Sequence, residues 1–288
     1  MPNLKDIKRR MGSVKNTQKI THAMKLVSAA KFARANQAVI ASRPYGTAFD
    51  KMVSQLVSMA GDSLKSPLLR QTVEEKKILV VIIATDRGLC GALNSNHFKN
   101  ALKFVRKKSA EGASVDIVGW GRRAFGFSKK LGMKSKSELE KVLDRPSYDT
   151  ARTLAEGIVE TFIKESYDSV YLAYVEFKSA LVQSPRVRQL LPVQGQTAAE
   201  TTSTVNIIVE PSPELLLESL LKKQIASLVF RALLEGNASE QGARMTAMDS
   251  ATKNAKEVVR KLSLQYNRGR QAAITKELIE ITSGADAL

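Results

Sequence analysis

The sequence predicts an α/β protein in which the N-terminal and C-terminal helices form a long antiparallel coiled coil. Between them it predicts a Rossmann-like α/β domain with a mainly parallel sheet. Apolar residues near both ends of the chain recur every three and four positions, the period of a coiled-coil seam. In the middle of the chain, apolar runs rich in β-branched residues alternate with helical stretches, which is typical of a largely parallel sheet.

Residues 1–60 form the first predicted block, a long and strongly basic helix. Asp6 is the only acidic residue before Arg43, in a stretch that carries ten Lys or Arg side chains. Pro44 is expected to kink or break the helix, because proline lacks a backbone N–H and its ring clashes with the preceding turn. The predicted seam comprises Leu4, Ile7, Met11, Val14, Gln18 and Thr21, with Ile20 and Met24 also directed inward, and it then blurs into Met24, Val27 and Ala30.

Residues 75–210 form the second predicted block, the α/β domain. The run ILVVIIA at 78–84 is apolar throughout, which indicates a strand buried on both faces of a sheet. The predicted strands are 78–84, 114–120 and 169–177, with further strands at 186–193 and 204–209, and the predicted helices are 94–109, 121–131 and 149–166.

Residues 213–288 form the third predicted block, a second long helix. A single helix of about 70 residues would measure about 105 Å, which exceeds the diameter of any domain that this chain could build. It is therefore expected to pair with the helix of residues 1–60, in a left-handed supercoil. Its predicted seam comprises Met245, Met248, Thr252, Ala255, Val259, Leu262, Tyr266, Gly269 and Ala273.

The composition limits the classes of function. The net charge of +17 predicts a polyanionic partner: nucleic acid, an anionic membrane surface or acidic proteins. Cys90 is the only cysteine and His22 and His97 are the only histidines, which disfavours disulfides, thiolate metal clusters and histidine-based catalysis. The first residues lack the apolar core of a signal peptide, and no run of about 20 apolar residues predicts a membrane span. We therefore expect a mature protein in a cytoplasm-like compartment.

The segment ATDRGLCGALNSN, residues 84–96, is the most enzyme-like feature. It joins a predicted buried strand to a helix, the place where a doubly wound fold binds phosphate. It matches neither dinucleotide-binding nor P-loop glycine motifs, so a tight turn is the favoured interpretation. A nucleotide-dependent enzyme that uses the loop Arg87–Asn94 remains one alternative, and a basic coiled-coil protein that binds nucleic acid is another.

The end of the chain, NRGRQAAITKELIEITSGADAL, carries a different signal. Arg268, Arg270 and Gln271 lie on a helix just before a small, apolar and nearly neutral tip. A terminus exposed to solvent is normally more polar than this one. The pattern therefore favours burial of the tip in a partner over a frayed helix end.

Three separated segments resemble the gamma subunits of bacterial F-type ATP synthases, and the resemblance covers the whole chain. The segments are KDIKRRMGSVKNTQKITHAMKLVSAAKF, ATDRGLCGALN, and ARMTAMDSATKNAKEVV with YNRGRQAAITKELIEITSGADAL. The resemblance implies a central-stalk rotor whose coiled coil turns inside a ring of three alpha and three beta subunits. It also implies an α/β foot that contacts the epsilon subunit and the membrane ring of c subunits, with the delta subunit elsewhere in the complex.

The resemblance also assigns roles to residues. It implies no catalytic residue, no metal, no cofactor, no direct nucleotide binding and no nucleic-acid partner, because catalysis belongs to the beta subunits. It places the chain at the cytoplasmic side of the bacterial inner membrane, as a peripheral protein. The residues that it implies as beta-subunit contacts are Met24, Lys25, Arg244, Arg268, Arg270, Gln271, Thr275 and Glu280, and Glu210 is the implied contact with the c ring or epsilon.

Overall fold

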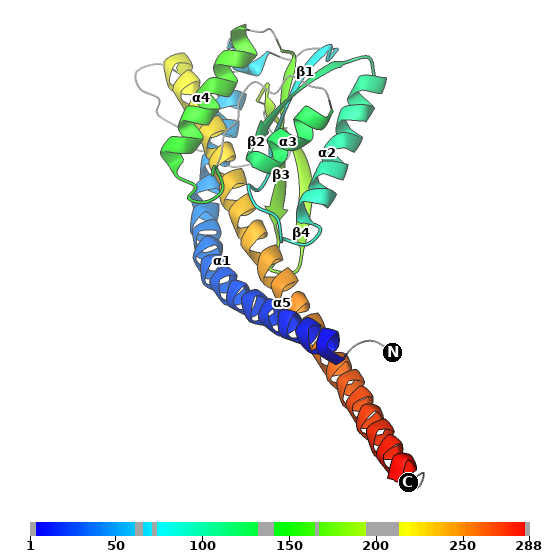
Figure 1. The fold of residues 1–288 in the computed structure, drawn as a ribbon. Helices are drawn as coiled ribbons and strands as arrows, with labels where there is room; N and C mark the ends of the chain where they lie inside the picture. Colours follow the sequence, from blue (N-terminus) through cyan, green and yellow to red (C-terminus); the bar gives the residue numbers. More distant parts are fainter. Residues whose placement is uncertain are drawn as a thin grey trace. The chain divides into compact units, whose positions relative to one another are not determined.

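The computed structural model forms two compact units, each of which is described separately (Figure 1). One unit comprises Met1–Ala30 and Arg244–Leu288, and the other comprises Lys31–Ala243. The helices α1 (Leu4–Ala60) and α5 (Pro213–Ala285) contribute residues to both units. The units therefore cut across the three blocks predicted from the sequence. The structure describes residues 4–60, 66–70, 74–131, 141–164, 167–193 and 213–285.

The unit Lys31–Ala243 contains a four-stranded sheet with the strand order β2-β1-β3-β4. β1 pairs in parallel with both β2 and β3, whereas β4 is antiparallel to β3, which confirms the predicted, mainly parallel sheet. The predicted strand at 204–209 lies outside the described residues. The strands are β1 (Lys77–Ile83), β2 (Ser114–Trp120), β3 (Ser169–Phe177) and β4 (Gln183–Leu191).

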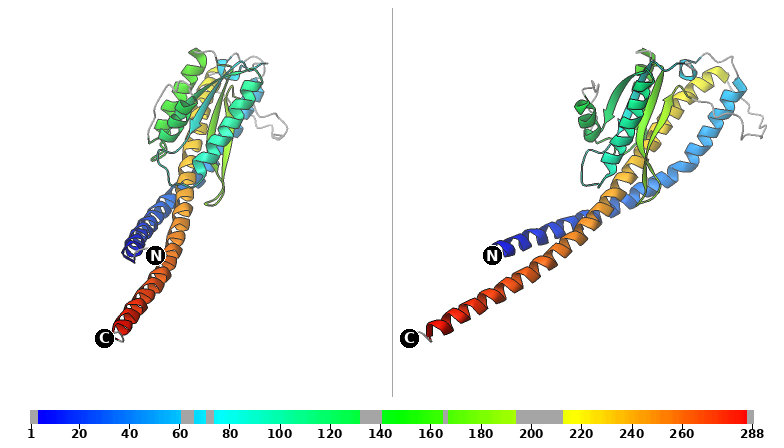
Figure 2. Two further views of the ribbon diagram at one scale, coloured as in Figure 1. Left: turned by 45° about the vertical axis from the view of Figure 1, so that its right-hand side comes forward. Right: turned by 90° about the vertical axis from the view of Figure 1, so that its right-hand side faces the viewer.

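Helices cover both faces of this sheet (Figures 1 and 2). Ile78, Val80 and Ile82 of β1 pack on one face, in a cluster with residues of α2 and α3. The alternate residues of β1 pack on the other face with α4 and with the parts of α1 and α5 that belong to this unit. Burial on both faces explains why β1 is apolar at every position. The additional helices are η2 (Pro67–Leu69), α2 (Leu93–Ala110), α3 (Arg122–Lys130) and α4 (Tyr148–Lys164).

α1 continues without interruption through Pro44, so the predicted break is wrong. A proline inside a helix leaves the carbonyl four residues earlier without its usual N–H donor. Here that carbonyl belongs to Ile40, and both Ile40 and Pro44 are exposed. Water therefore has access to the carbonyl oxygen, which lowers the cost of the missing hydrogen bond.

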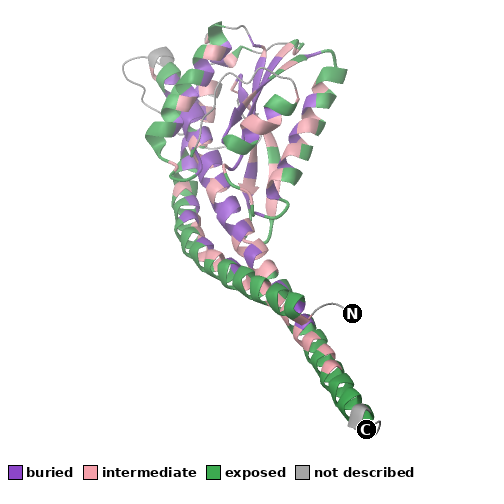
Figure 3. Cartoon of the chain, in the orientation of Figure 1, coloured by how far each residue is buried: buried purple, intermediate pink, exposed green. Residues whose placement is uncertain are grey.

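The unit formed by Met1–Ala30 and Arg244–Leu288 is a two-helix coiled coil, and its seam confirms the predicted periodicity. Leu4, adjacent to Gly269, marks one end: a Cβ added at Gly269 would lie 3.0 Å from Leu4 Cδ2. Thr21 lies next to Thr252 farther along, so the two helices are antiparallel. All the predicted seam positions from Leu4 to Thr21 and from Met245 to Ala273 are buried or half-buried, and the positions between them are mostly exposed (Figure 3).

The predicted seam was wrong at three positions of α1. Ile20 is 61% exposed and Val27 and Ala30 are also exposed, whereas Ser28 is buried. Ser28 follows Thr21 by seven residues and so continues the heptad, while Ile20 and Val27 each precede a seam position by one residue. A shift of one residue along a helix rotates the side-chain direction by about 100°. The side chains of Ile20 and Val27 are therefore directed away from α5.

His97 on α2 is a buried histidine whose charged form the fold disfavours. It is 1% exposed, and its Nε2 has no hydrogen-bond partner among the described residues. Burial lowers the pKa of His97 to about 4, against a smaller opposing effect from a hydrogen bond with the Ile83 backbone. The unfolded chain therefore binds more protons than the folded chain between pH 4 and the ordinary histidine pKa of 6.5.

This pKa predicts a loss of stability in mild acid. As pH falls from 6.5 to 4, the free energy of unfolding of this unit should fall by up to about 3 kcal/mol because of His97. Above pH 6.5 the contribution is constant. Trp120, buried in the same unit and the only tryptophan of the chain, provides the fluorescence signal for urea unfolding at each pH. The variant His97→Gln should lack this part of the pH dependence, and identical pH profiles for both proteins would contradict the prediction.

Candidate partner-contact site on the coiled coil

A hydroxyl pair occupies the seam where the sequence predicts polar residues. Thr252 Oγ1 lies 2.8 Å from Thr21 Oγ1 and 2.7 Å from the carbonyl oxygen of Met248. Thr21 Oγ1 also lies 3.1 Å from the carbonyl oxygen of Gln18. Each hydroxyl has one proton, so one can bond to the other hydroxyl while the second bonds to a helix carbonyl. A buried polar pair of this kind is satisfied in only one alignment of the two helices, and it therefore specifies their register.

An ion pair flanks the hydroxyl pair. Lys25 Nζ lies 2.6 Å from Asp249 Oδ1, and Lys253 Nζ lies 2.8 Å from the other carboxylate oxygen. The two ammonium groups, with Lys25 the stronger influence, lower the pKa of Asp249 to about 2. Sequence reasoning named Lys25 as a partner contact but missed Asp249. Opposite charges on either side of an apolar seam are the signal that could have found it.

The surface of α1 outside the seam is both apolar and basic. Ile20, Leu26 and Val27 are all more than half exposed. Lysines surround them along the helix, for example Lys19 and Lys31. Large apolar side chains are stabilised by removal from water. A group of them exposed on one helix is therefore typical of a surface that binds a partner.

The predicted contact residues fall into two groups along the unit. Met24 is half-buried, Lys25 is paired with Asp249, and Arg244 is buried on the facing helix near the same level. The second group is roughly 36 Å farther along α5, at the helical rise of 1.5 Å per residue. Its members are all exposed: Arg268, Arg270, Gln271, Thr275 and Glu280. Glu210 lies outside the described residues.

The second group surrounds the helix rather than sharing one face. The seam ends at Ala273, and every residue from 274 to 283 is exposed (Figure 3). Ile281 is 67% exposed, and Ile274, Leu278 and Ile279 are about half exposed or more. Within the described part of the chain, the one ion pair of Glu280 is a local pair with Lys276, at 3.3 Å. A single helix with apolar side chains on open faces is a surface that a partner enclosing it would stabilise.

The loop at 84–96 directs its polar groups at its own backbone and neighbouring turns. Thr85 Oγ1 donates to the carbonyl oxygen of Arg87 and accepts from Asn94 Nδ2, at 2.7 and 2.8 Å. The carboxylate of Asp86 accepts the backbone N–H groups of Arg122 and Lys141, each at 2.8 Å. These bonds support the interpretation of this segment as a structural turn.

Two searches of the described residues bear on the remaining function classes. No described helix has the length and apolar character needed to cross a bilayer. In the same part of the chain, no three or more His, Cys, Asp or Glu side chains are grouped so that they could hold a metal ion.

The fold and the site define a class of protein: an α/β domain combined with a coiled coil of the two chain ends, whose outer surface is basic and partly apolar. Comparison with known proteins identifies the family. A family model described as ATP synthase matches residues 3–288. The ATP synthase gamma chain of Geobacter metallireducens is 48% identical over 288 residues, covering 100% of this chain and 99% of the relative. That of Chlorobium limicola is 43% identical over 291 residues, with the same coverage. The chain therefore belongs to the ATP synthase gamma-chain family, as the resemblance predicted.

Solved structures show the same fold. A chain of the mitochondrial ATP synthase central stalk and c ring of Tetrahymena thermophila has a TM-score of 0.62 and 25% identity, covering 81% of this chain and 99% of that one. A chain of the Euglena gracilis mitochondrial ATP synthase rotor has a TM-score of 0.65 and 18% identity, covering 94% and 98%. The alternative of a nucleic-acid-binding coiled coil has no support among these relatives.

The Lys25–Asp249 pair predicts a measurable coupling across the seam. Asp249→Lys should lower the free energy of unfolding of the coiled coil, because three cations then meet at one level. The double variant Lys25→Asp with Asp249→Lys should recover most of that loss. Urea unfolding of the full chain, followed by far-ultraviolet circular dichroism, measures both. Glu257→Lys, which breaks an exposed pair with Lys261 inside one helix, serves as the control and should change stability much less than Asp249→Lys. If the change in stability of the double variant equals the sum of the changes for Lys25→Asp and Asp249→Lys alone, the coupling is ruled out.

Proposed function

We propose that this chain is the central-stalk rotor subunit of a bacterial F-type ATP synthase. In this role the coiled coil turns inside the ring of alpha and beta subunits and couples proton flow across the membrane to ATP synthesis or hydrolysis on the beta subunits. The full-length match to gamma chains, at 48% identity with 99% of the relative covered, is the observation that carries the proposal. The geometry of the coiled coil supports it, because a narrow seam leaves most of each helix surface available to a surrounding ring.

The chain is proposed to be non-catalytic and to bind no nucleotide or cofactor itself. The loop at 84–96 supports this part of the proposal, because Thr85, Asp86 and Asn94 are engaged in bonds within the domain. The chain acts on the beta subunits mechanically: its asymmetric surface favours a different conformation in each of them as it turns. A bound protein shifts a conformational equilibrium of its partner only if it binds the conformations with different affinities. The contacts between this chain and each beta subunit must therefore change as the chain turns.

The proposed beta-subunit contacts are of two kinds. Met24 and the exposed apolar residues beside it form a basic and apolar surface suited to acidic segments of a partner. Lys25 contributes to this surface while its ammonium is shared with Asp249, and Arg244 supports it from the facing helix. The second kind consists of hydrogen-bonding side chains on the open end of α5: Arg268, Arg270, Gln271, Thr275 and Glu280.

The α/β domain is proposed to contact the epsilon subunit and the c ring, with Glu210 as the expected acidic contact. The chain would then be a peripheral protein at the cytoplasmic side of the bacterial inner membrane, held there by the membrane ring and not by a segment of its own. The c-ring context of one relative of known structure supports this arrangement.

Subunit stoichiometry tests the proposed function directly. The chain, isolated with its native complex, should be present as one copy for every three alpha and three beta chains. Native mass spectrometry of the intact complex measures the ratio. A complex with equal numbers of the three chains, or a chain that purifies without alpha and beta subunits, would refute the function.

A substitution pair tests the contacts on the open end of α5. Arg270→Ala and Gln271→Ala should each lower ATP hydrolysis by the assembled complex by about tenfold, because each removes a hydrogen bond made in only part of the cycle. Lys256→Ala, at an exposed position on the same helix, should leave the rate unchanged. Wild-type rates in both contact variants would show that these side chains carry no coupling.

A further inference from the structure

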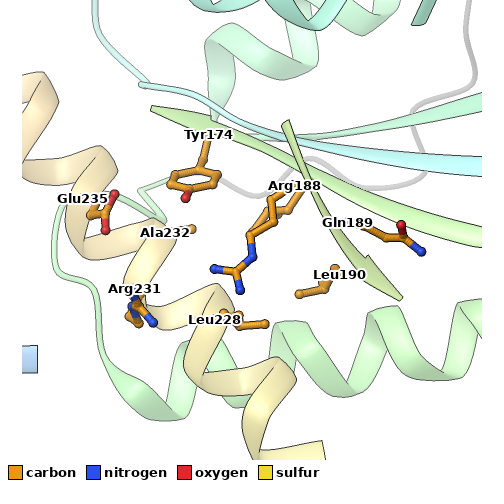
Figure 4. Close-up of a pocket in the computed structure, with 9 residues that line it drawn as sticks. Tyr174, Arg188, Gln189, Leu190, Leu228, Arg231, Ala232 and Glu235 are labelled. Atoms are coloured by element: carbon orange, nitrogen blue, oxygen red, sulfur yellow. The ribbon is translucent and has the colours of Figure 1, made fainter. Parts of the chain in front are cut away.

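A small cleft opens between the sheet and α5 within the unit Lys31–Ala243 (Figure 4). Its volume is about 20 Å³, which is space for one or two oxygen atoms. The walls combine apolar side chains with three charged ones, Arg188, Arg231 and Glu235. The lining residues that carry the argument are Tyr174 and Arg188 from the sheet and Leu228, Arg231 and Glu235 from α5.

Arg188 is the central side chain of the cleft. It pairs with Leu172 across β3 and β4, so it lies on the sheet face that is directed at α5. Figure 4 shows its guanidinium extending between Tyr174 and Leu190 and over Leu228. Among the described residues, Arg188 forms no ion pair, although Arg186, two positions earlier on the same face, pairs with Glu176 at 3.1 Å.

Arg231 brings a second guanidinium to the cleft, and the fold fixes its position. Its Nη1 lies 3.1 Å from Asp50 Oδ2 on α1. Gly46, one turn before Asp50, makes room for the side chain, since a Cβ at that position would lie 2.9 Å from Arg231 Cδ. Asp50 also accepts from Gln224, at 3.4 Å. Asp50 is thus engaged by Arg231 and Gln224, whereas the exposed Arg188 forms no ion pair among the described residues.

Glu235 does not supply a counter-charge to Arg188. Its carboxylate accepts the backbone N–H of Phe177 at 3.3 Å, which directs it toward the end of β3, and it forms no ion pair with either arginine. Burial raises the pKa of Glu235, so the site already disfavours its charged form. The Tyr174 hydroxyl, a hydrogen-bond donor, also lies on the wall of the cleft.

We propose that the cleft between Arg188, Arg231 and Tyr174 binds a carboxylate side chain of a protein subunit that packs on the α/β domain. Two guanidinium groups and a phenol are suited to a planar carboxylate, which accepts paired N–H donors. The volume admits the two carboxylate oxygens but not a nucleotide or a sugar phosphate. The inference rests on the proposed function, because that function places partner subunits against this domain.

The carboxylate is assigned to a protein and not to a free ion for an energetic reason. Ion pairs near the protein surface are weak, and a single such site does not hold a free monovalent anion at ordinary concentrations. A carboxylate carried by a docked partner has an effective concentration that is far higher, so the same weak pair remains occupied.

Carbodiimide coupling in the assembled complex tests the assignment. The variant Arg188→Lys keeps the positive charge and adds an amine, which a water-soluble carbodiimide joins only to a carboxylate in direct contact. Peptide mass spectrometry of the treated complex should identify a bond between position 188 and an Asp or Glu of another subunit. The matched variant Arg186→Lys should couple to Glu176 of the same chain, because that pair already exists.

The outcomes separate this inference from the function on which it rests. Coupling of position 188 only to Glu235 or Asp50 of its own chain, or no product where Arg186→Lys gives one, would overturn the inference in a complex of the expected stoichiometry. Absence of the chain from the complex would overturn the proposed function and the inference with it. In addition, Arg188→Glu should speed dissociation of the coupled subunit at least tenfold, whereas Arg186→Gln should not, and equal rates for the two would count against the cleft.

Discussion

The coiled coil depends on a seam that is narrow and partly polar. Thr21 and Thr252 satisfy each other at 2.8 Å, and Lys25 and Asp249 flank them at 2.6 Å. These interactions contribute less free energy than an apolar core of the same length, but they are satisfied in one register only. The two helices are thereby aligned with few residues, and the remaining surface is free for partners. A rotor needs such a surface, because a shaft that bound its surrounding subunits very tightly in one orientation would not turn away from that orientation.

The same two helices carry a different pattern in the other unit. There, residues 32–57 and 216–238 pack against a sheet that is buried on both faces, and many of their apolar side chains join its core. A single helix thus changes its partner along its length, from one narrow seam to a broad apolar face. Outside this core, the chain carries polar and charged groups on the surfaces where partners are expected. The basic surface of α1 and the cleft at Arg188 are two such surfaces.

Much of this could be predicted from the sequence. The heptad spacing located the seam from Leu4 to Thr21 and from Met245 to Ala273, because burial on a helix follows its period. The same spacing leads from Thr21 to Ser28, and the prediction named Val27 because a small polar residue looks less suited to burial than valine. The charges that flank the seam could have identified Asp249, whereas the cleft at Arg188 joins residues far apart in the chain and has no local signal. The functional role came from the resemblance, as no local pattern encodes rotation.

The central claim is that the two terminal helices move as one body, held by their seam. Paired cysteines at its polar centre, Thr21→Cys with Thr252→Cys, test it most directly in the assembled complex, because the two hydroxyls that they replace are only 2.8 Å apart. Oxidation should join the helices covalently, and ATP hydrolysis coupled to proton movement should continue at the rate of the reduced complex. Loss of coupled activity on oxidation, with recovery on reduction, would show that the helices must move against each other and would contradict the account.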